Sequence, residues 1–243
     1  MITALALVTI FLGSVMKGAI GMGLPLLAIP LLTIALDVPT AIAIVAVPII
    51  VTNTLQVAQF RRALLAQRYM LPFLVAGAVG TFIGTQVLVS APVELLQVAL
   101  GVAVLVYLAS QLALPALTLP LSRASFFAGP FGFVTGLLQG AVGISSPVSV
   151  TFLQSLRVDR EGFVSAISAV FLLFSMVQVS VLIADGTLTL ERAGIGALTL
   201  LAVAAGMPLG DRLGRRLSAD IFRRVIFVAL AGIAVLLIAN GLG

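Results

Sequence analysis

Two glycine-rich breaks between apolar runs hold most of the residues that could do chemistry in this chain. The first is Lys17-Gly-Ala-Ile-Gly-Met-Gly-Leu-Pro25, which carries the only lysine of the sequence. The second is Gln139-Gly-Ala-Val-Gly-Ile-Ser-Ser-Pro147. The alanine, two of the glycines and the final proline recur in register. This recurrence predicts that the two breaks are copies of one structural unit.

Each break ends in a pattern that is typical of a helix start. Pro25 and Pro147 suit the first turn of a helix, and the serine pair before Pro147 offers a good N-cap. The free backbone N–H groups and the positive dipole end of each helix would then face the break. Lys17 adds a full positive charge opposite the neutral Gln139. We therefore predict that the two breaks meet and bind an anion.

The predicted substrate-binding residues come from both breaks and from polar positions in the helices that follow them. They are Lys17, Gly18, Gly21, Gly23, Pro25, Asn53, Gln56, Gln139, Gly140, Gly143, Ser145, Ser146, Pro147, Ser175 and Gln178. No catalytic residue, metal ligand or cofactor is predicted, because the sequence has no histidine, no cysteine and no clustered carboxylates. An enzymatic function is therefore not expected.

The composition predicts an integral membrane protein. Hydrophobic residues make up 61% of the 243 residues, charged residues only 9%, and the mean hydropathy is +1.29. A water-soluble domain needs a larger charged fraction on its surface. Long apolar runs without alternation indicate helices rather than an outer-membrane barrel. Because the arginines sit in short loops, the net charge of +5 is interpreted as a topology signal, and nucleic acid is not an expected partner.

Six apolar segments approach the ~20 residues that a bilayer core requires. They are 39–60, 69–89, 93–112, 162–184, 193–210 and 219–239, the last with its first turns in the headgroup region. Two further regions, 1–36 and 124–157, each contain two apolar runs around a break and are too short for two full spans. We predict that each forms a hairpin of two shortened or broken helices, with its break near the middle of the bilayer.

The repeat extends beyond the breaks. The offset between them also relates Gln56 to Gln178. After a small shift in the loops, a pair of glycines recurs at a spacing that favours close helix packing, namely Gly80 and Gly84, then Gly206 and Gly210. We therefore divide the single membrane domain into two repeats, residues 1–118 and 119–243.

Charge placement predicts that the two repeats are inverted. The loop 61–68 carries three arginines, whereas its counterpart 185–192 is mainly acidic; the next pair reverses this, because 90–94 carries only Glu94 and 211–224 carries five arginines. The positive-inside rule places such counterparts on opposite sides. Three full spans after each hairpin satisfy this, with both termini outside the cytoplasm. Eight spans with parallel halves would put the five-arginine loop outside, so that arrangement is rejected.

Each group of candidate residues also has a structural alternative. Lys17 could extend to a membrane surface if its helix is short. The glycines could serve close helix crossings, and the polar residues of the following helices could bond to other helices without any substrate. Asp37 and Asp159 are expected to cap helices; the alternative is a coupling site for a proton or a cation.

The pattern Lys-Gly-x-x-Gly-x-Gly-x-Pro, followed by Leu-Ala-Ile-Pro-Leu-Leu at residues 27–32, resembles the sulfite exporter TauE/SafE family of membrane permeases. The weaker copy in the second half extends the likeness over the whole chain. The resemblance implies transport of sulfite, sulfonates and related organosulfur anions across the cytoplasmic membrane, with the site at the two breaks. The second break departs from the first, because Ser145-Ser146 replaces Gly23-Leu24. The two halves need not bind equally.

We therefore expect a secondary transporter of the inner membrane that exports a small sulfur-containing anion by alternating access. A passive anion channel and a transporter of small carboxylates are the alternatives. The expected partners are the anionic substrate and the lipid bilayer. A coupling ion and a homo-oligomer are left open. The absence of a nucleotide-binding loop means that energy would come from an ion gradient, the membrane potential or the gradient of the substrate itself.

Overall fold

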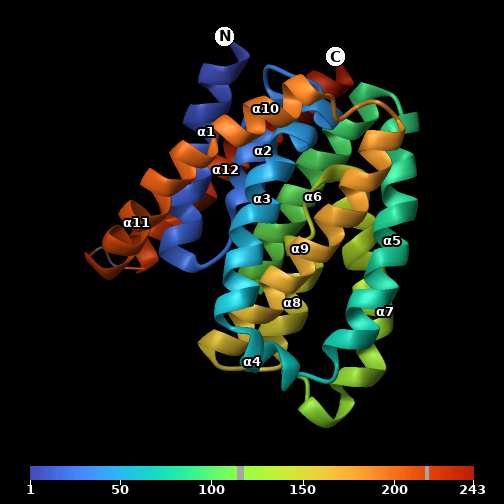
Figure 1. Ribbon diagram of the computed structural model, residues 1–243, viewed down its shortest axis with the longest axis vertical. Coiled ribbons are helices and arrows are strands. Elements are labelled where there is room, and N and C mark those ends of the chain that lie inside the picture. Colours follow the sequence, from blue (N-terminus) through green and yellow to red (C-terminus); the bar gives the residue numbers. More distant parts are fainter. Residues whose placement is uncertain (114–117, 217–218) are drawn as a thin grey trace.

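Every regular element of the computed structural model is a helix, over the described residues 1–113, 118–216 and 219–243 (Figure 1). The predicted all-α fold is confirmed. The helices are α1 (Ile2–Ile20), α2 (Leu24–Thr33), α3 (Val38–Gln59), α4 (Arg61–Leu65), α5 (Met70–Ser90), α6 (Val93–Ala113), α7 (Leu121–Val142), α8 (Ser146–Ser155), α9 (Arg160–Ala184), α10 (Leu190–Leu198), α11 (Leu200–Arg216) and α12 (Ala219–Leu242).

Seven stretches among the described residues are long and apolar enough to cross a membrane. Four predicted spans correspond to α3, α5, α6 and α9, and a fifth corresponds to α10 and α11, which count together as one stretch, Leu190–Arg215. The other two stretches are α1 and α7. The predicted span 219–239 falls on α12, whose described apolar part is Ile226–Leu242. The predicted class, a multi-pass membrane protein, is therefore confirmed.

The first arm of each hairpin is longer than predicted. α1 has 19 residues and α7 has 22, whereas α2 and α8 have 10 each. Each first arm ends at a glycine in the left-handed conformation, Gly21 with φ 88° and Gly143 with φ 73°. Of the two shortened or broken helices predicted for each hairpin, α2 and α8 are short, whereas α1 and α7 are not shortened. Enough helical residues precede each glycine for a full span, and α7 begins at Leu121 rather than at 124.

Figure 1 shows the two hairpins starting from opposite ends of the molecule. α1 begins at the upper end, and the turn between α2 and α3 returns there. α7 begins at the lower end, and the turn between α8 and α9 lies at that end too. Each hairpin therefore returns to the end from which it started. The orientation of the two halves in a membrane, and the division of the chain at 118/119, stay predictions.

Close glycine contacts join the two halves in corresponding pairs. A methyl group on Gly18 of α1 would collide with the carbonyl oxygen of Met207 on α11, and one on Gly140 of α7 would collide with that of Thr81 on α5. The glycines predicted from their spacing make equivalent contacts with the backbones of α7 and α1, namely Gly80 and Gly84, then Gly206 and Gly210. Close helix packing at these positions is confirmed.

Replacing Gly136 by Ala is expected to destabilise the fold by about 1–3 kcal/mol, because the new methyl group meets the Gly77 backbone of α5. The matched control is Gly129→Ala on the same helix, where an added methyl group meets nothing within 4 Å. That change should be neutral or slightly stabilising, since alanine favours a helix over glycine. Thermal unfolding in detergent measures both variants, and equal melting temperatures would contradict the packing described here.

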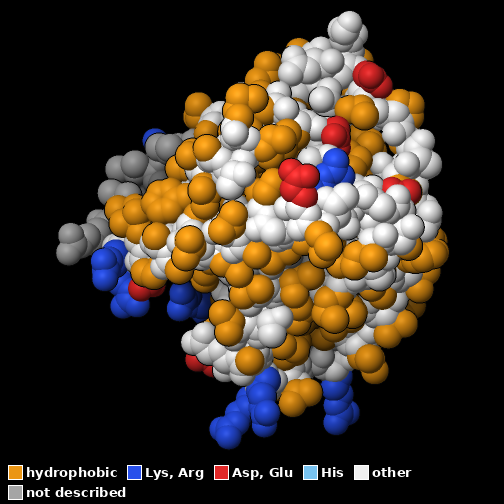
Figure 2. All heavy atoms as spheres, turned by 45° about the horizontal axis from the view of Figure 1, so that its top comes forward, with side chains coloured by type: hydrophobic (Ala, Val, Ile, Leu, Met, Phe, Trp, Pro, Cys, Tyr) orange, Lys and Arg blue, Asp and Glu red, His pale blue; other side chains and the backbone are white. Residues whose placement is uncertain are grey.

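The charged side chains separate toward different ends of the molecule. Figure 2 shows basic groups along the lower margin and lower left, and most of the visible acidic groups in the upper part. Residues 211–216, predicted as a loop, are instead the last turns of α11, where Arg215 and Asp211 form an ion pair of 3.0 Å one turn apart. Residues 217–218 and the side chains of Arg216 and Arg223 lie outside the described residues.

The two aspartates that end the hairpins are helix caps, as predicted. An Asp37 carboxylate oxygen accepts a hydrogen bond from the Thr40 backbone N–H at 2.7 Å, at the start of α3. Asp159 accepts one from the Gly162 N–H at 3.0 Å, at the start of α9. Capping by aspartate satisfies N–H groups that the first turn of a helix leaves free.

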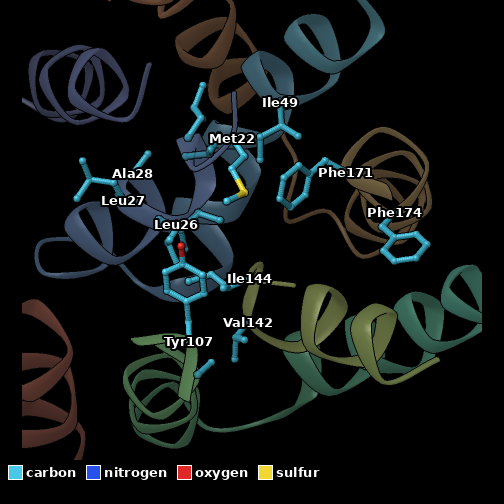
Figure 3. Packing of buried hydrophobic residues seen from close by; sticks show 14 of the residues in the cluster. Met22, Leu26, Leu27, Ala28, Ile49, Tyr107, Val142, Ile144, Phe171 and Phe174 are labelled. Carbon is cyan, nitrogen blue, oxygen red and sulfur yellow. The ribbon is translucent and has the colours of Figure 1, made fainter. Parts of the chain in front are cut away.

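The breaks themselves are held inside the apolar core. Figure 3 shows Met22, from the first break, near Ile49 and Phe171, and Ile144, from the second, near Leu26. Met22 and Ile144 are both buried. Non-helical backbone at membrane depth is tolerated where protein covers it. The apolar core therefore covers the non-helical backbone of both breaks.

Candidate functional site

Lys17 lies in the last turn of α1 with its side chain inside the protein, only 2% exposed. Its ammonium donates hydrogen bonds to Thr52 Oγ1 at 3.1 Å and to Asn53 Oδ1 at 2.7 Å, both on α3. The Asn53 amide nitrogen donates to the Ile49 carbonyl, which turns the amide oxygen toward the ammonium. Lys17 therefore fastens the end of α1 to the C-terminal half of α3 and does not extend to a surface.

The positive charge of Lys17 has no acidic partner among the described residues. The one ion pair found there is the exposed Arg215–Asp211 pair. An ammonium carries three N–H donors, and Thr52 and Asn53 accept two of them. A charged residue at membrane depth costs at least ~2.5–3.5 kcal/mol on insertion scales. A bound anion would accept the third hydrogen bond and neutralise the charge.

A cavity of about 340 Å³ reaches Lys17 from the end of the molecule at which α9 begins. Among the described residues, Arg160, which is exposed, is the one other basic residue that lines it, and the acidic lining residues are Glu161 and Asp211. Among the described charged residues that line this cavity, Lys17 is therefore the one that is buried. The remaining lining residues are Gly18, Gly21, Gln56, Phe60, Val164, Met207 and Pro208.

The polar residues of the second break form a different, uncharged group. Gln178 on α9 donates from its amide nitrogen to the carbonyl oxygens of Gln139 and Gly140, at 3.0 Å each. The Gln139 amide nitrogen donates to Gln178 Oε1 at 3.4 Å. Both side chains are buried. Gln178 thus fastens the end of α7 to α9, much as Lys17 fastens α1 to α3.

Ser145 occupies the N-cap position of α8, as the sequence indicated, but its side chain makes no capping hydrogen bond. Its hydroxyl is buried without a hydrogen-bond partner, and so are the Ser175 hydroxyl and the Gln139 side-chain oxygen. Buried polar atoms without partners are rare in native proteins, and each calls for an explanation.

The predicted site residues thus fall into two groups. Gly18, Gly21 and Gln56 line the Lys17 cavity, and Asn53 binds Lys17 directly. Gln139, Gly140 and Ser145 belong to the second break, Gln178 bonds to it, and Ser175 lies one turn before Gln178 on α9. No hydrogen bond between described residues joins the two groups, and none of the residues 139–147 lines the Lys17 cavity.

The remaining predicted residues have packing environments instead. Gly23 is in the left-handed conformation and faces Met16, Pro25 is buried in the first turn of α2, and Gly143 faces Ile29 and Ile42. Ser146 and Pro147 are buried at the start of α8. These positions shape the breaks without lining the Lys17 cavity.

Sequence reasoning missed two contributions to the site. Thr52 accepts from Lys17, and its position beside Asn53 in an apolar run was the available signal. The residues that α9 and α11 bring to the cavity, such as Arg160 and Met207, gave no signal, because they lie far from the break in sequence. Gln56 also accepts a hydrogen bond of 3.0 Å from Ser168 on α9, so the interhelical alternative holds for this residue.

Comparison with known protein families matches residues 5–237 to the family described as Sulfite exporter TauE/SafE. The chain belongs to the sulfite exporter TauE/SafE family. The match covers nearly the whole chain, which confirms the resemblance seen at the first break. TauE/SafE proteins are membrane transporters of sulfite and related anions, in agreement with the apolar helices found here. No curated protein and no solved structure matched the chain.

Proposed function

We propose that this TauE/SafE protein is a secondary transporter that exports a small sulfur-containing anion, such as sulfite or a sulfonate, by alternating access. The observation that carries the proposal is the buried Lys17 ammonium, which has two neutral acceptors and an adjoining cavity. A sulfite or sulfonate group presents three acceptor oxygens and a negative charge. One of these oxygens would accept a hydrogen bond from the third N–H of Lys17, and the anion would neutralise the positive charge of the lysine.

The size of the cavity favours a small substrate. About 340 Å³ lies at the lower end of the range of typical ligand pockets, roughly 300–1,000 Å³. Apolar lining residues such as Phe60, Val164 and Met207 would accommodate a short organic group on a sulfonate.

Charge placement supports export. We infer that the end of the molecule at which α4 and the start of α9 lie is cytoplasmic, because arginines gather there. The Lys17 cavity then opens to the cytoplasm, and both termini are outside. With a negative interior, outward movement of one anionic charge is favoured by ~2.3 kcal/mol per 100 mV. The inner membrane is the location that fits this arrangement.

The paired glycine contacts support alternating access. α1 packs on α11, and α7 packs on α5, through residues that correspond in the repeat. If the repeats are inverted, exchanging the arrangements of the two halves would close the cavity at one end and open its counterpart at the other. We propose that movement of these two helix pairs against α3 and α9 exposes the anion to each side in turn.

A thermal-shift screen of the purified protein tests the substrate class. Sulfite, taurine and sulfoacetate at saturating concentration are expected to raise the melting temperature by a few degrees, because a ligand that binds only the folded state stabilises it. Sulfate and small carboxylates should give smaller shifts. A larger response to carboxylates than to sulfonates would move the function to carboxylate transport. Counterflow of labelled sulfite in liposomes separates a carrier from a channel, because only a carrier shows it.

A further inference from the structure

Three buried oxygen atoms have no hydrogen-bond partner among the described residues. Two belong to the second break, and the third lies on α9 one turn before Gln178, the residue that bonds to this break. They are Gln139 Oε1 in the last turn of α7, Ser145 Oγ at the start of α8 and Ser175 Oγ in the middle of α9. None of the three residues is more than 2% exposed. Leaving a polar group buried and unpaired is unfavourable, so these three atoms point to a ligand.

The hydrogen bonds of Gln178 determine which side-chain atom of Gln139 has no hydrogen-bond partner. The Gln178 amide nitrogen is committed to two backbone carbonyls, which leaves its Oε1 as an acceptor toward Gln139. The Gln139 nitrogen donates to that oxygen at 3.4 Å. Turning the Gln139 amide over would bring two oxygens together. Gln139 Oε1 is therefore the unpaired atom, and an amide oxygen can only accept.

The first repeat shows what occupies the equivalent position there. The repeat relates Lys17 to Gln139 and Asn53 to Ser175. In the first half, the Lys17 ammonium lies against the Asn53 amide oxygen at 2.7 Å and the Thr52 hydroxyl at 3.1 Å. In the second half, the residue in place of lysine is neutral and the nearby oxygens are unpaired. The second break thus has acceptors for a cation but no covalently attached cation.

We propose that the second break binds a monovalent metal cation, Na⁺, through Gln139 Oε1, Ser145 Oγ and Ser175 Oγ. Hard cations take oxygen ligands, and helix ends at membrane breaks supply such ligands in transporters. The described residues contain no carboxylate cluster that would suit a divalent ion. The negative dipole end of α7 favours a cation here, while the start of α8 opposes it. An anion is disfavoured, because Gln139 Oε1 cannot donate to it.

Bound Na⁺ would join α7, α8 and α9 in the way that Lys17 joins α1 to α3. The binding site stands on the unpaired oxygens alone. Its role as the coupling ion of anion export rests, in addition, on the proposed function. The two can fail separately, because Na⁺ binding is measurable without any sulfur anion.

The test is thermal unfolding of the purified full chain in choline chloride, KCl and NaCl at constant chloride and ionic strength. Saturable stabilisation by NaCl, by a few degrees over choline chloride, is the expected result. Ser175→Ala should reduce the apparent Na⁺ affinity tenfold or more. The control is Ser180→Ala on the same helix, whose hydroxyl is exposed and bonds only to its own turn. Ser180→Ala should keep the full response.

A second variant, Gln139→Lys, supplies the second repeat with the ammonium of the first. It is expected to unfold at the same temperature with and without Na⁺. Identical melting of the native chain in NaCl and choline chloride would overturn the site, as would a full Na⁺ response in Ser175→Ala. A response to sulfite, but not Na⁺, that Ser175→Ala abolishes would assign the break to the anion instead. Na⁺ binding without any sulfite transport would support the binding site but contradict its role in coupling.

Discussion

Replacing Lys17 by Gln is expected to reduce anion transport roughly 100-fold or more, which corresponds to about 3 kcal/mol. The change removes the positive charge of the buried lysine that lines the cavity and puts in its place the residue that the second repeat has at Gln139. A glutamine at position 17 could still donate to the Asn53 oxygen, so the end of α1 would stay attached to α3. Sulfite uptake into inside-out membrane vesicles, or sulfite efflux from loaded proteoliposomes, measures the reduction in transport.

The melting temperature of the Lys17→Gln protein should not fall. Removing a buried charge that has no acidic partner in the described part of the chain eliminates its desolvation cost, which offsets the lost hydrogen bond. Arg215→Gln is the matched control, because it removes one charge of the same sign from the exposed end of α11. That variant should transport within about twofold of the native protein, since exposed ion pairs contribute little. Full transport by Lys17→Gln would refute the anion site.

The second large effect is expected at Gln178, where replacement by Leu should destabilise the protein by about 2–4 kcal/mol. The leucine fills a similar volume but leaves the carbonyl oxygens of Gln139 and Gly140 without their side-chain donor and the Gln139 amide without its acceptor. All of these groups are buried, so water does not replace the lost bonds. Thermal unfolding in detergent measures the change.

Gln154→Leu provides the comparison for Gln178. Gln154 is exposed, and its one side-chain hydrogen bond among the described residues is accepted from the Gln111 amide nitrogen at 3.4 Å. Replacing it should change stability by less than about 0.5 kcal/mol. If the two leucine variants melt at the same temperature, Gln178 does not anchor the second break.

The amino-acid sequence alone determined the class of this protein and the location of its special segments. Its apolar runs predicted α3, α5, α6 and α9 to within a few residues, because membrane thickness fixes how long such a run must be. The paired glycines predicted close helix packing, because only small residues allow helix backbones to touch. The break at Lys17 also carried the family resemblance that the match over 5–237 confirmed.

Only the tertiary structure decided how the two breaks are used. Hydropathy and spacing are local properties, whereas the acceptors of Lys17 lie on α3 and the walls of its cavity come from α9 and α11. The sequence therefore gave no reason to separate the polar residues into one group around a charged lysine and another around unpaired oxygens. That separation depends on which helix packs against each break. A buried polar atom can bond only to the groups that helix packing places within hydrogen-bond distance.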